Sequence, residues 1–299
     1  MNWIILTLFS FLMFAISSTI DGISIKKYIG NSKIYLFYGT LMQGLIGMFV
    51  FFFVDVNLNQ GIFFLVVAFS TGLFYVYGLL PYMNALKFEE VSRIAPLFQL
   101  GPLFVLVLSI LFLDINLNGT QYLGFSLLVA GSILISVKRI NGLIKISKGF
   151  WYMMLTNLLL AGFFIGTDYL FKNYNFWDTF FFIQLGIFIS SLTLIFFKEY
   201  GIDGIKKFGK ISPVGKTLVV SAAIISFAGI GLRNFAIDLK SAALVTSLEG
   251  FQVLFVFLIT IGMSLKFPQI LGEEIDRETL LMKTISIVSL MVGIYFISI

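Results

Sequence analysis

The residues of this chain that could do chemistry are a few charged side chains inside strongly apolar segments. Glu249 is the clearest of them, because it lies about eight residues into an apolar run and has Gly250 and Gln252 beside it. A charged side chain at the centre of a bilayer costs roughly 2.5–3.5 kcal/mol on insertion scales, so such residues usually face a cavity or a partner. Glu249 is therefore a candidate ligand-binding residue. The competing interpretation is a structural ion pair, or a protonated acid bonded to a neighbouring helix.

Two further charges, Arg233 and Asp168, lie near the ends of other apolar runs. We expect those two ends to share one membrane side with the start of the segment that holds Glu249, so the three residues could converge. Two acids and one arginine leave one negative charge unmatched, which could hold a proton, a sodium ion or an amine. The competing interpretations are that Arg233 extends to the membrane interface and that Asp168 pairs with Lys172, four residues later.

The first half of the chain offers weaker counterparts. Asp21 takes the place of Asp168, and Tyr82 takes the place of Arg233, so the predicted site is asymmetric. Polar side chains inside spans also form hydrogen bonds between helices, which is the alternative role for each candidate wall residue. These candidates are Tyr82, Asn84, Gln99 and Asn157.

The absence of cysteine and histidine limits the possible chemistry further. It excludes disulfides, thiolate or imidazole metal sites and the commonest general base. The sequence also contains no phosphate loop, zinc-ligand spacing, nucleophile elbow or dinucleotide fingerprint. We therefore expect no enzyme, no metal and no cofactor beyond a coupling proton or sodium ion. The net charge of +5 is interpreted as loop charge, not as a nucleic-acid-binding surface.

The elements that must position these residues are membrane spans. Hydrophobic residues make up 59% of the chain and charged residues only 12%, which predicts a multi-pass protein of the cell membrane. The N-terminus has no basic region before its apolar run and is interpreted as the first span, not as a signal peptide. We expect an all-α fold with ten spans at 3–22, 34–54, 61–81, 94–113, 120–137, 150–171, 179–197, 217–236, 241–263 and 280–298.

The lysines and arginines predict how these spans are oriented. Seventeen of the 20 lie in the odd-numbered linkers, which the positive-inside rule places in the cytoplasm. Ten spans then put both termini outside.

The two halves of the sequence also resemble each other. A shift of 151 residues places Leu103-Phe104-Val105 on Leu254-Phe255-Val256 and Gly78 on Gly229, and a shift of 147 places Asp21 on Asp168. We interpret residues 1–149 and 150–299 as two five-span repeats. Because five is odd, the second repeat must be inverted, as in secondary transporters with a substrate site between their halves.

A family resemblance follows from longer motifs. Ala85-Leu86 after a polar helix end, then IAPLFQLGPLFVLVLSILFLD and TQYLGFSLLVAGSILI, make residues 64–136 resemble one half of an EamA-like transporter of the drug/metabolite transporter superfamily. The segments AIDLKSAALVTSLEGFQVLFVFLI and SLMVGIYFI in the second half are similar but lack the proline. This resemblance implies ten helices, a cavity bounded by the first, third and fourth helices of each half, and export or exchange of small metabolites.

The chain departs from the family pattern in two respects. Asp114 stands after the fourth span, where the family often has glutamate. The family also usually keeps both termini in the cytoplasm, opposite to the orientation that the lysine and arginine count predicts.

We expect a secondary active transporter of a small amphipathic metabolite, such as an amino acid or an amine, that works by alternating access in the lipid bilayer. The alternative is a membrane-embedded accessory subunit or a flippase for a lipid-linked substrate. Small residues at Ser126 and Ala130, and at Ser289 and Gly293, favour close helix contact. They predict packing between the halves or a homodimer, and the sequence does not distinguish the two.

Overall fold

Helices form all of the regular structure that the computed structural model describes, which covers residues 2–85, 88, 97–136, 148–198, 200, 206, 211–266 and 277–298. The first half contains α1 (Trp3–Ser24), η1 (Ile25–Ile29), α2 (Ser32–Met48), η2 (Phe49–Phe52), α3 (Ile62–Ala85), α5 (Gly101–Leu113) and α6 (Gly119–Ser136). The second half contains α7 (Lys148–Asn173), α8 (Phe176–Thr193), η3 (Leu194–Phe196), α10 (Pro213–Leu239), α11 (Ala242–Ser247), α12 (Gly250–Lys266) and α13 (Arg277–Ser298).

Polar residues at the helix starts explain several of these boundaries. The side chains of Asn31 and Asn175 accept backbone N–H bonds from the first turns of α2 and α8, and Ser212 does the same for α10. Such caps satisfy N–H groups that have no partner within the helix. At the other end of a span, Asp114 closes α5 in a left-handed conformation, with φ of 51°.

The ten predicted spans each contain a helix, which confirms the prediction of an all-α membrane protein. Among the described residues, seven helices are long and apolar enough to cross a membrane, and three shorter apolar helices lie at Gly101–Leu113, Gly119–Leu134 and Thr284–Ile297. Residues 94–96, at the start of the predicted fourth span, lie outside the described part of the chain.

The predicted ninth span at 241–263 contains two helices, α11 and α12, because the chain turns between them at Leu248 and Glu249. The turn brings the backbone of Gly250 against α6, where an added Cβ would lie 2.1 Å from the Ser132 hydroxyl oxygen. A side chain at residue 250 would therefore prevent this close approach.

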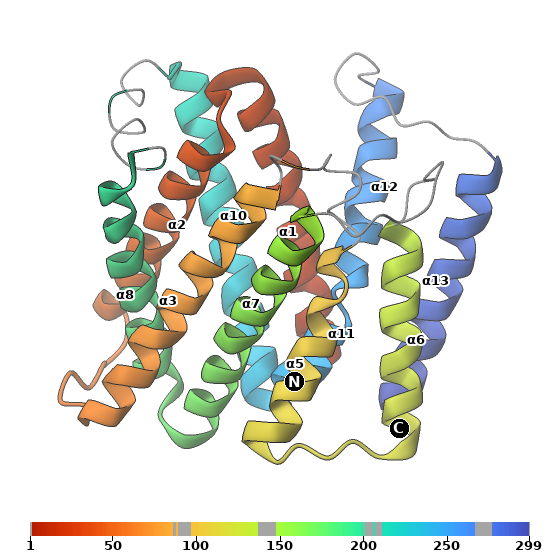
Figure 1. Cartoon of the computed structure of the whole chain (residues 1–299), viewed down its shortest axis with the longest axis horizontal. Coiled ribbons are helices and arrows are strands. Elements are labelled where there is room, and N and C mark those ends of the chain that lie inside the picture. Colours follow the sequence, from red (N-terminus) through yellow and green to blue (C-terminus); the bar gives the residue numbers. More distant parts are fainter. Residues whose placement is uncertain are drawn as a thin grey trace.

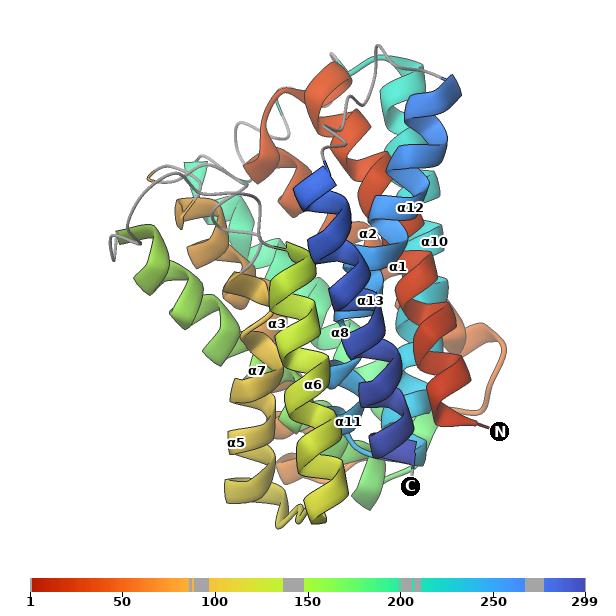
Figure 2. The same cartoon turned by 90° about the vertical axis from the view of Figure 1, so that its right-hand side faces the viewer.

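The helices pair in a pattern that crosses the two halves. The most extensive contacts join α1 with α10, α3 with α7 and α6 with α13. In Figure 1, α2 and α8 form one edge of the bundle and α6 and α13 form the other. Figure 2 shows the α6 and α13 pair from the front, and both chain ends lie toward the lower end of the bundle in the two views. Two inverted repeats would pair in this way; the boundary at residues 149 and 150 stays a prediction.

Small residues set the contact between α6 and α13. Gly124 faces Gly293 so closely that a Cβ on Gly124 would lie 2.8 Å from the Gly293 carbonyl oxygen, and the Ser289 hydroxyl donates to the Leu127 carbonyl at 2.8 Å. The Ser289 and Gly293 face is thus used for packing within the chain. Ser126 and Ala130 are exposed on the outer side of α6.

We expect Gly124→Ala to lower the free energy of unfolding by about 1–3 kcal/mol, the usual range for overpacking a close contact. The added methyl group meets the Gly293 carbonyl oxygen at 2.8 Å and the Ile297 backbone nitrogen and Cγ1 at 2.9 Å, and because backbone atoms cannot move aside as a side chain can, α6 and α13 must separate. Thermal unfolding of the purified protein in detergent measures this. Gly231→Ala is the control, because a Cβ there has no neighbour within 4 Å; equal stability of the two variants would contradict the packing argument.

Candidate functional site

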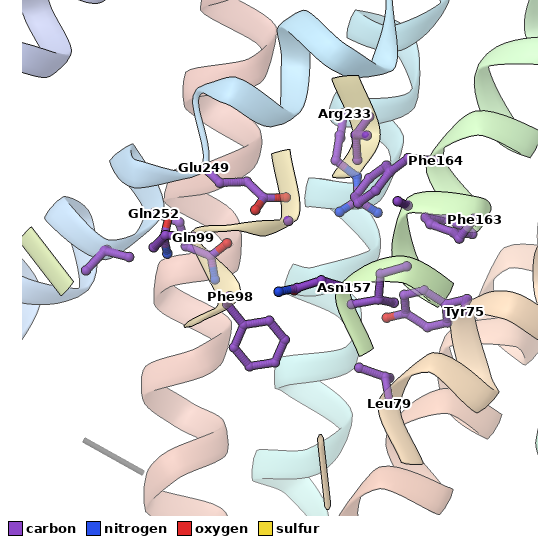
Figure 3. A pocket seen from close by; sticks show the side chains of 15 residues that line it. Tyr75, Leu79, Phe98, Gln99, Asn157, Phe163, Phe164, Arg233, Glu249 and Gln252 are labelled. Carbon is purple, nitrogen blue, oxygen red and sulfur yellow. The ribbon is translucent and has the colours of Figure 1, made fainter. Parts of the chain in front are cut away.

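A cavity of about 360 Å³ lies between α3, α7, α10 and two spans in which the helix is interrupted, and we call it the central cavity (Figure 3). The first of these spans is interrupted just before α5, and the second is interrupted between α11 and α12. The family resemblance predicted that six helices would form the walls of this cavity. Five of them border it, and α1 does not contribute to its lining. Polar groups enter it from four of these elements. They are Gln99, Asn157, Arg233, Glu249 and Gln252.

The backbone next to the cavity is irregular in both halves. At the first interruption Leu100 N–H bonds the Leu97 carbonyl at 3.2 Å, and at the second Glu249 N–H bonds the Thr246 carbonyl at 2.9 Å. Both are tight turns that link residues three apart instead of four. The α-helix resumes at a glycine in each case, Gly101 and Gly250. Each interrupted span thus brings a turn of backbone to the cavity.

Glu249 and Arg233 extend toward one another from opposite sides of the central cavity (Figure 3). No ion pair within 4 Å joins these two side chains. The guanidinium of Arg233 instead lies over aromatic faces, 5.0 Å from the ring centroids of Phe14 and Phe164. These rings supply cation–π attraction without using the N–H donors, and the Arg233 Nε has no hydrogen-bond partner among the described residues.

Two amide side chains complete the polar lining. The Asn157 Nδ2 donates to the Leu97 carbonyl at 2.8 Å, which fixes the first interruption against α7. Gln99 is 6% exposed, and its Oε1 has no hydrogen-bond partner in the described part of the chain. A buried acceptor without a donor costs about 1–3 kcal/mol, so Gln99 is a group that a bound ligand could satisfy.

Asp168 does not join this site. It is fully buried, its Oδ2 accepts the Ala242 N–H at 2.8 Å, and its Oδ1 lies 3.0 Å from the Lys172 Nζ. The carboxylate therefore caps the first turn of α11 and forms the i,i+4 pair that was the competing interpretation. The expected convergence of three charges is met by Arg233 and Glu249 but not by Asp168.

The other sequence candidates divide between two places. Asp21 and Tyr82 line a second cavity of about 580 Å³, which we call the Asp21 cavity. The Tyr82 ring also packs edge-to-face on Phe98, with centroids 4.9 Å apart. Asn84 lies near the end of α3 and does not line either cavity.

Several residues of the central cavity were not predicted as site residues. Tyr75, Phe163 and Phe164 supply aromatic walls, and Gly101 lies where an added Cβ would be 3.6 Å from the Asn157 Oδ1 and 3.9 Å from the Glu249 Oε2. In a chain with 36 phenylalanines, no sequence signal separates lining rings from lipid-facing ones. The Gly101-Pro102 pair, by contrast, marks a helix start that proline at the second position favours.

Three comparisons connect this architecture to known proteins. Residues 1–137 match the family model described as the EamA-like transporter family. A curated relative from Sinorhizobium sp, named "Uncharacterized transporter in cobO 3'region", is 38% identical over 58 residues, which covers 19% of this chain and 41% of that relative. The matched segment thus spans less than half of the relative's length.

A solved crystal structure, titled only as that of a protein, aligns over 98% of this chain and 96% of its own with a TM-score of 0.71. At 14% identity this likeness establishes the fold alone. It confirms the predicted fold over nearly the whole chain, and the family match confirms the resemblance seen in the sequence motifs. Residues 1–137, just under half of the chain, are thus similar to the EamA-like transporter family, and the described helices are those of a multi-pass membrane protein.

Proposed function

We propose that this transporter moves a small amphipathic metabolite, such as an amino acid or an amine, by secondary active transport. The observation that carries the proposal is the pair Glu249 and Arg233, two opposite charges that face one cavity without pairing directly. Unpaired charges away from water are costly, and a ligand with an ammonium and a carboxylate group would compensate both.

The central cavity suits such a ligand in size and lining. Its volume of about 360 Å³ falls within the range of roughly 300–1,000 Å³ usual for small-molecule sites. Glu249 would accept hydrogen bonds from an ammonium group, and the free Arg233 N–H donors would bind a carboxylate. The rings of Phe98 and Tyr75 supply a wall for an apolar or aromatic side chain.

The interrupted spans fit a rocking mechanism. In inverted-repeat transporters, discontinuous helices hold the substrate between halves that move against each other. Residues 1–149 and 150–299 would be those halves here, with a proton or sodium ion as the coupling ion. The lysine and arginine count favours a cytoplasmic location for the odd linkers and an outside location for both termini.

A matched set of indole compounds tests the two charges separately. We expect Glu249→Gln to weaken tryptophan and tryptamine binding, and Arg233→Gln to weaken tryptophan while sparing tryptamine, which has no carboxylate. Each lost charge-assisted contact is worth about 1.5–3 kcal/mol, or about 10- to 150-fold in affinity. Equilibrium binding of the radiolabelled compounds to purified protein measures this, and uptake into proteoliposomes extends it to transport.

Wild-type protein that folds well but binds neither tryptophan nor tryptamine would contradict the proposal and favour a lipid-linked substrate. Unchanged tryptophan binding in Glu249→Gln would likewise remove Glu249 from the site.

A steric variant tests whether the ligand occupies the space beside Gly101. We expect Gly101→Ala to keep the protein stable, because the new methyl group meets its neighbours at ordinary contact distances of 3.6 and 3.9 Å. The methyl group would nevertheless take volume between Asn157 and Glu249, so tryptophan affinity should fall by about tenfold, near 1.4 kcal/mol. Equilibrium binding and thermal unfolding, measured on the same preparation, separate the two effects; unaltered affinity would place the ligand elsewhere.

Asp168→Ala should show the opposite pattern. Loss of the cap on Ala242 leaves a buried N–H without a partner, so we expect unfolding to become easier by about 1–3 kcal/mol. Affinity for tryptophan per folded molecule should not change, because Asp168 lies outside the central cavity lining. Thermal unfolding and binding stoichiometry measure the two quantities, and a loss of affinity at full stability would return Asp168 to the binding site.

A further inference from the structure

The Asp21 cavity is larger than the central cavity and has a different electrostatic character. It lies where α1 and α3 end and where α2 and α10 begin, and its volume is about 580 Å³. Asp21 is only partly buried and faces this space. Among the described residues that line it there is no lysine or arginine, so Asp21 has no cationic partner within the cavity.

The Asp21 carboxylate can accept further hydrogen bonds beyond those that it already makes. Tyr35 on α2 donates its hydroxyl proton to the Asp21 Oδ1. An ionised carboxylate can accept about four hydrogen bonds, so the bond from Tyr35 and the interaction with the Ser17 side chain leave acceptor capacity on Asp21, which lines the cavity.

The remaining lining favours an organic cation over a metal ion or an anion. The rings of Tyr35, Tyr75 and Tyr82 border the cavity together with Met83 and Val219. Aromatic faces attract ammonium groups and apolar side chains bind the carbon skeleton of an amine. A hard cation such as Na⁺ or Mg²⁺ would need several oxygen ligands close together, and no group of three or more acidic side chains is found among the described residues.

The two cavities adjoin each other. Tyr75 and Leu79 on α3 line both of them, and the Tyr75 hydroxyl donates to the Gln43 Oε1 on α2 at 2.8 Å. These two side chains therefore border both the Asp21 cavity and the central cavity.

We infer that the Asp21 cavity is a second binding site, specific for organic amines, which selects positively charged ligands before they reach the central cavity. The existence of this site does not depend on the proposed function, whereas the passage of the amine onward to Glu249 does rest on it. Because Asp21 carries the only ionised group that faces the cavity among the described residues, the site rejects carboxylates that the Arg233 side of the central cavity would accept.

The experiment uses the purified full chain with Glu249→Gln, so that the central cavity carries no carboxylate. We expect radiolabelled tryptamine to bind this protein saturably, and excess indole-3-acetate not to displace it. Adding Asp21→Asn should weaken tryptamine binding by about tenfold or more, the effect of one lost charge-assisted contact. Adding Asp55→Asn is the matched control, since Asp55 is an exposed acid in the loop before α3, and it should change nothing.

Tyr35→Phe distinguishes a binding role of Asp21 from a structural one. It removes the hydrogen bond but keeps the carboxylate, so tryptamine affinity should rise, whereas a structural role predicts that both Tyr35→Phe and Asp21→Asn weaken binding.

The absence of saturable binding in the Glu249→Gln protein, or equal affinities for Asp21→Asn and Asp55→Asn, would overturn the inference. Failure of the proposed function looks different: tryptamine would bind wild-type and Glu249→Gln proteins equally, while Asp21→Asn would still weaken that binding by about tenfold or more.

Discussion

The constraint on which the rest of this structure depends is that a bilayer offers no hydrogen-bond partner to the backbone. A spanning segment can leave the helical conformation only where protein or a cavity satisfies the freed groups. This chain leaves the helical conformation at Leu97–Gly101 and at Leu248–Gly250, where hydrogen bonds between residues three apart replace the helical ones. The Asn157 side chain donates a hydrogen bond to the Leu97 carbonyl. The central cavity lies beside both interruptions. The position of the site therefore follows from where the backbone is allowed to be irregular.

The charges of the site depend on the same absence of water. Arg233 is held over the faces of Phe14, Phe163 and Phe164, which stabilise its charge, while its Nε has no hydrogen-bond partner among the described residues. Had a carboxylate been placed in direct contact with it, as Lys172 contacts Asp168, the pair would be satisfied and a ligand would have to displace it. Aromatic packing thus keeps a cation inside the protein in a form that can still bind.

The sequence predicted the spans, and four of its eight candidate site residues line the central cavity, for reasons that can be traced to particular residues. Long apolar runs are decisive for membrane helices, and charges such as Glu249 and Arg233 are rare enough inside them to stand out. Hydropathy did not reveal the turn at Leu248, because one glutamate and one glycine hardly change the average of a span. The aromatic walls were equally hidden, since Phe163 and Phe164 do not differ in type from the many phenylalanines that face lipid.

Asp21 and Asp168, which the sequence pairs through a shift of 147 residues, have different surroundings in the structure. Each lies near the C-terminal end of the first helix of its half, and the sequence alone pairs them. The residue four positions later differs, because Lys172 follows Asp168 whereas Ile25 follows Asp21. On a helix, that position is the nearest neighbour on the same face. Lysine draws the second acid into an ion pair and a cap on α11, whereas isoleucine leaves the first acid facing a cavity with a tyrosine hydroxyl as its hydrogen-bond donor. The difference between Lys172 and Ile25 thus accompanies the difference between a carboxylate held in an ion pair and one that lines a cavity.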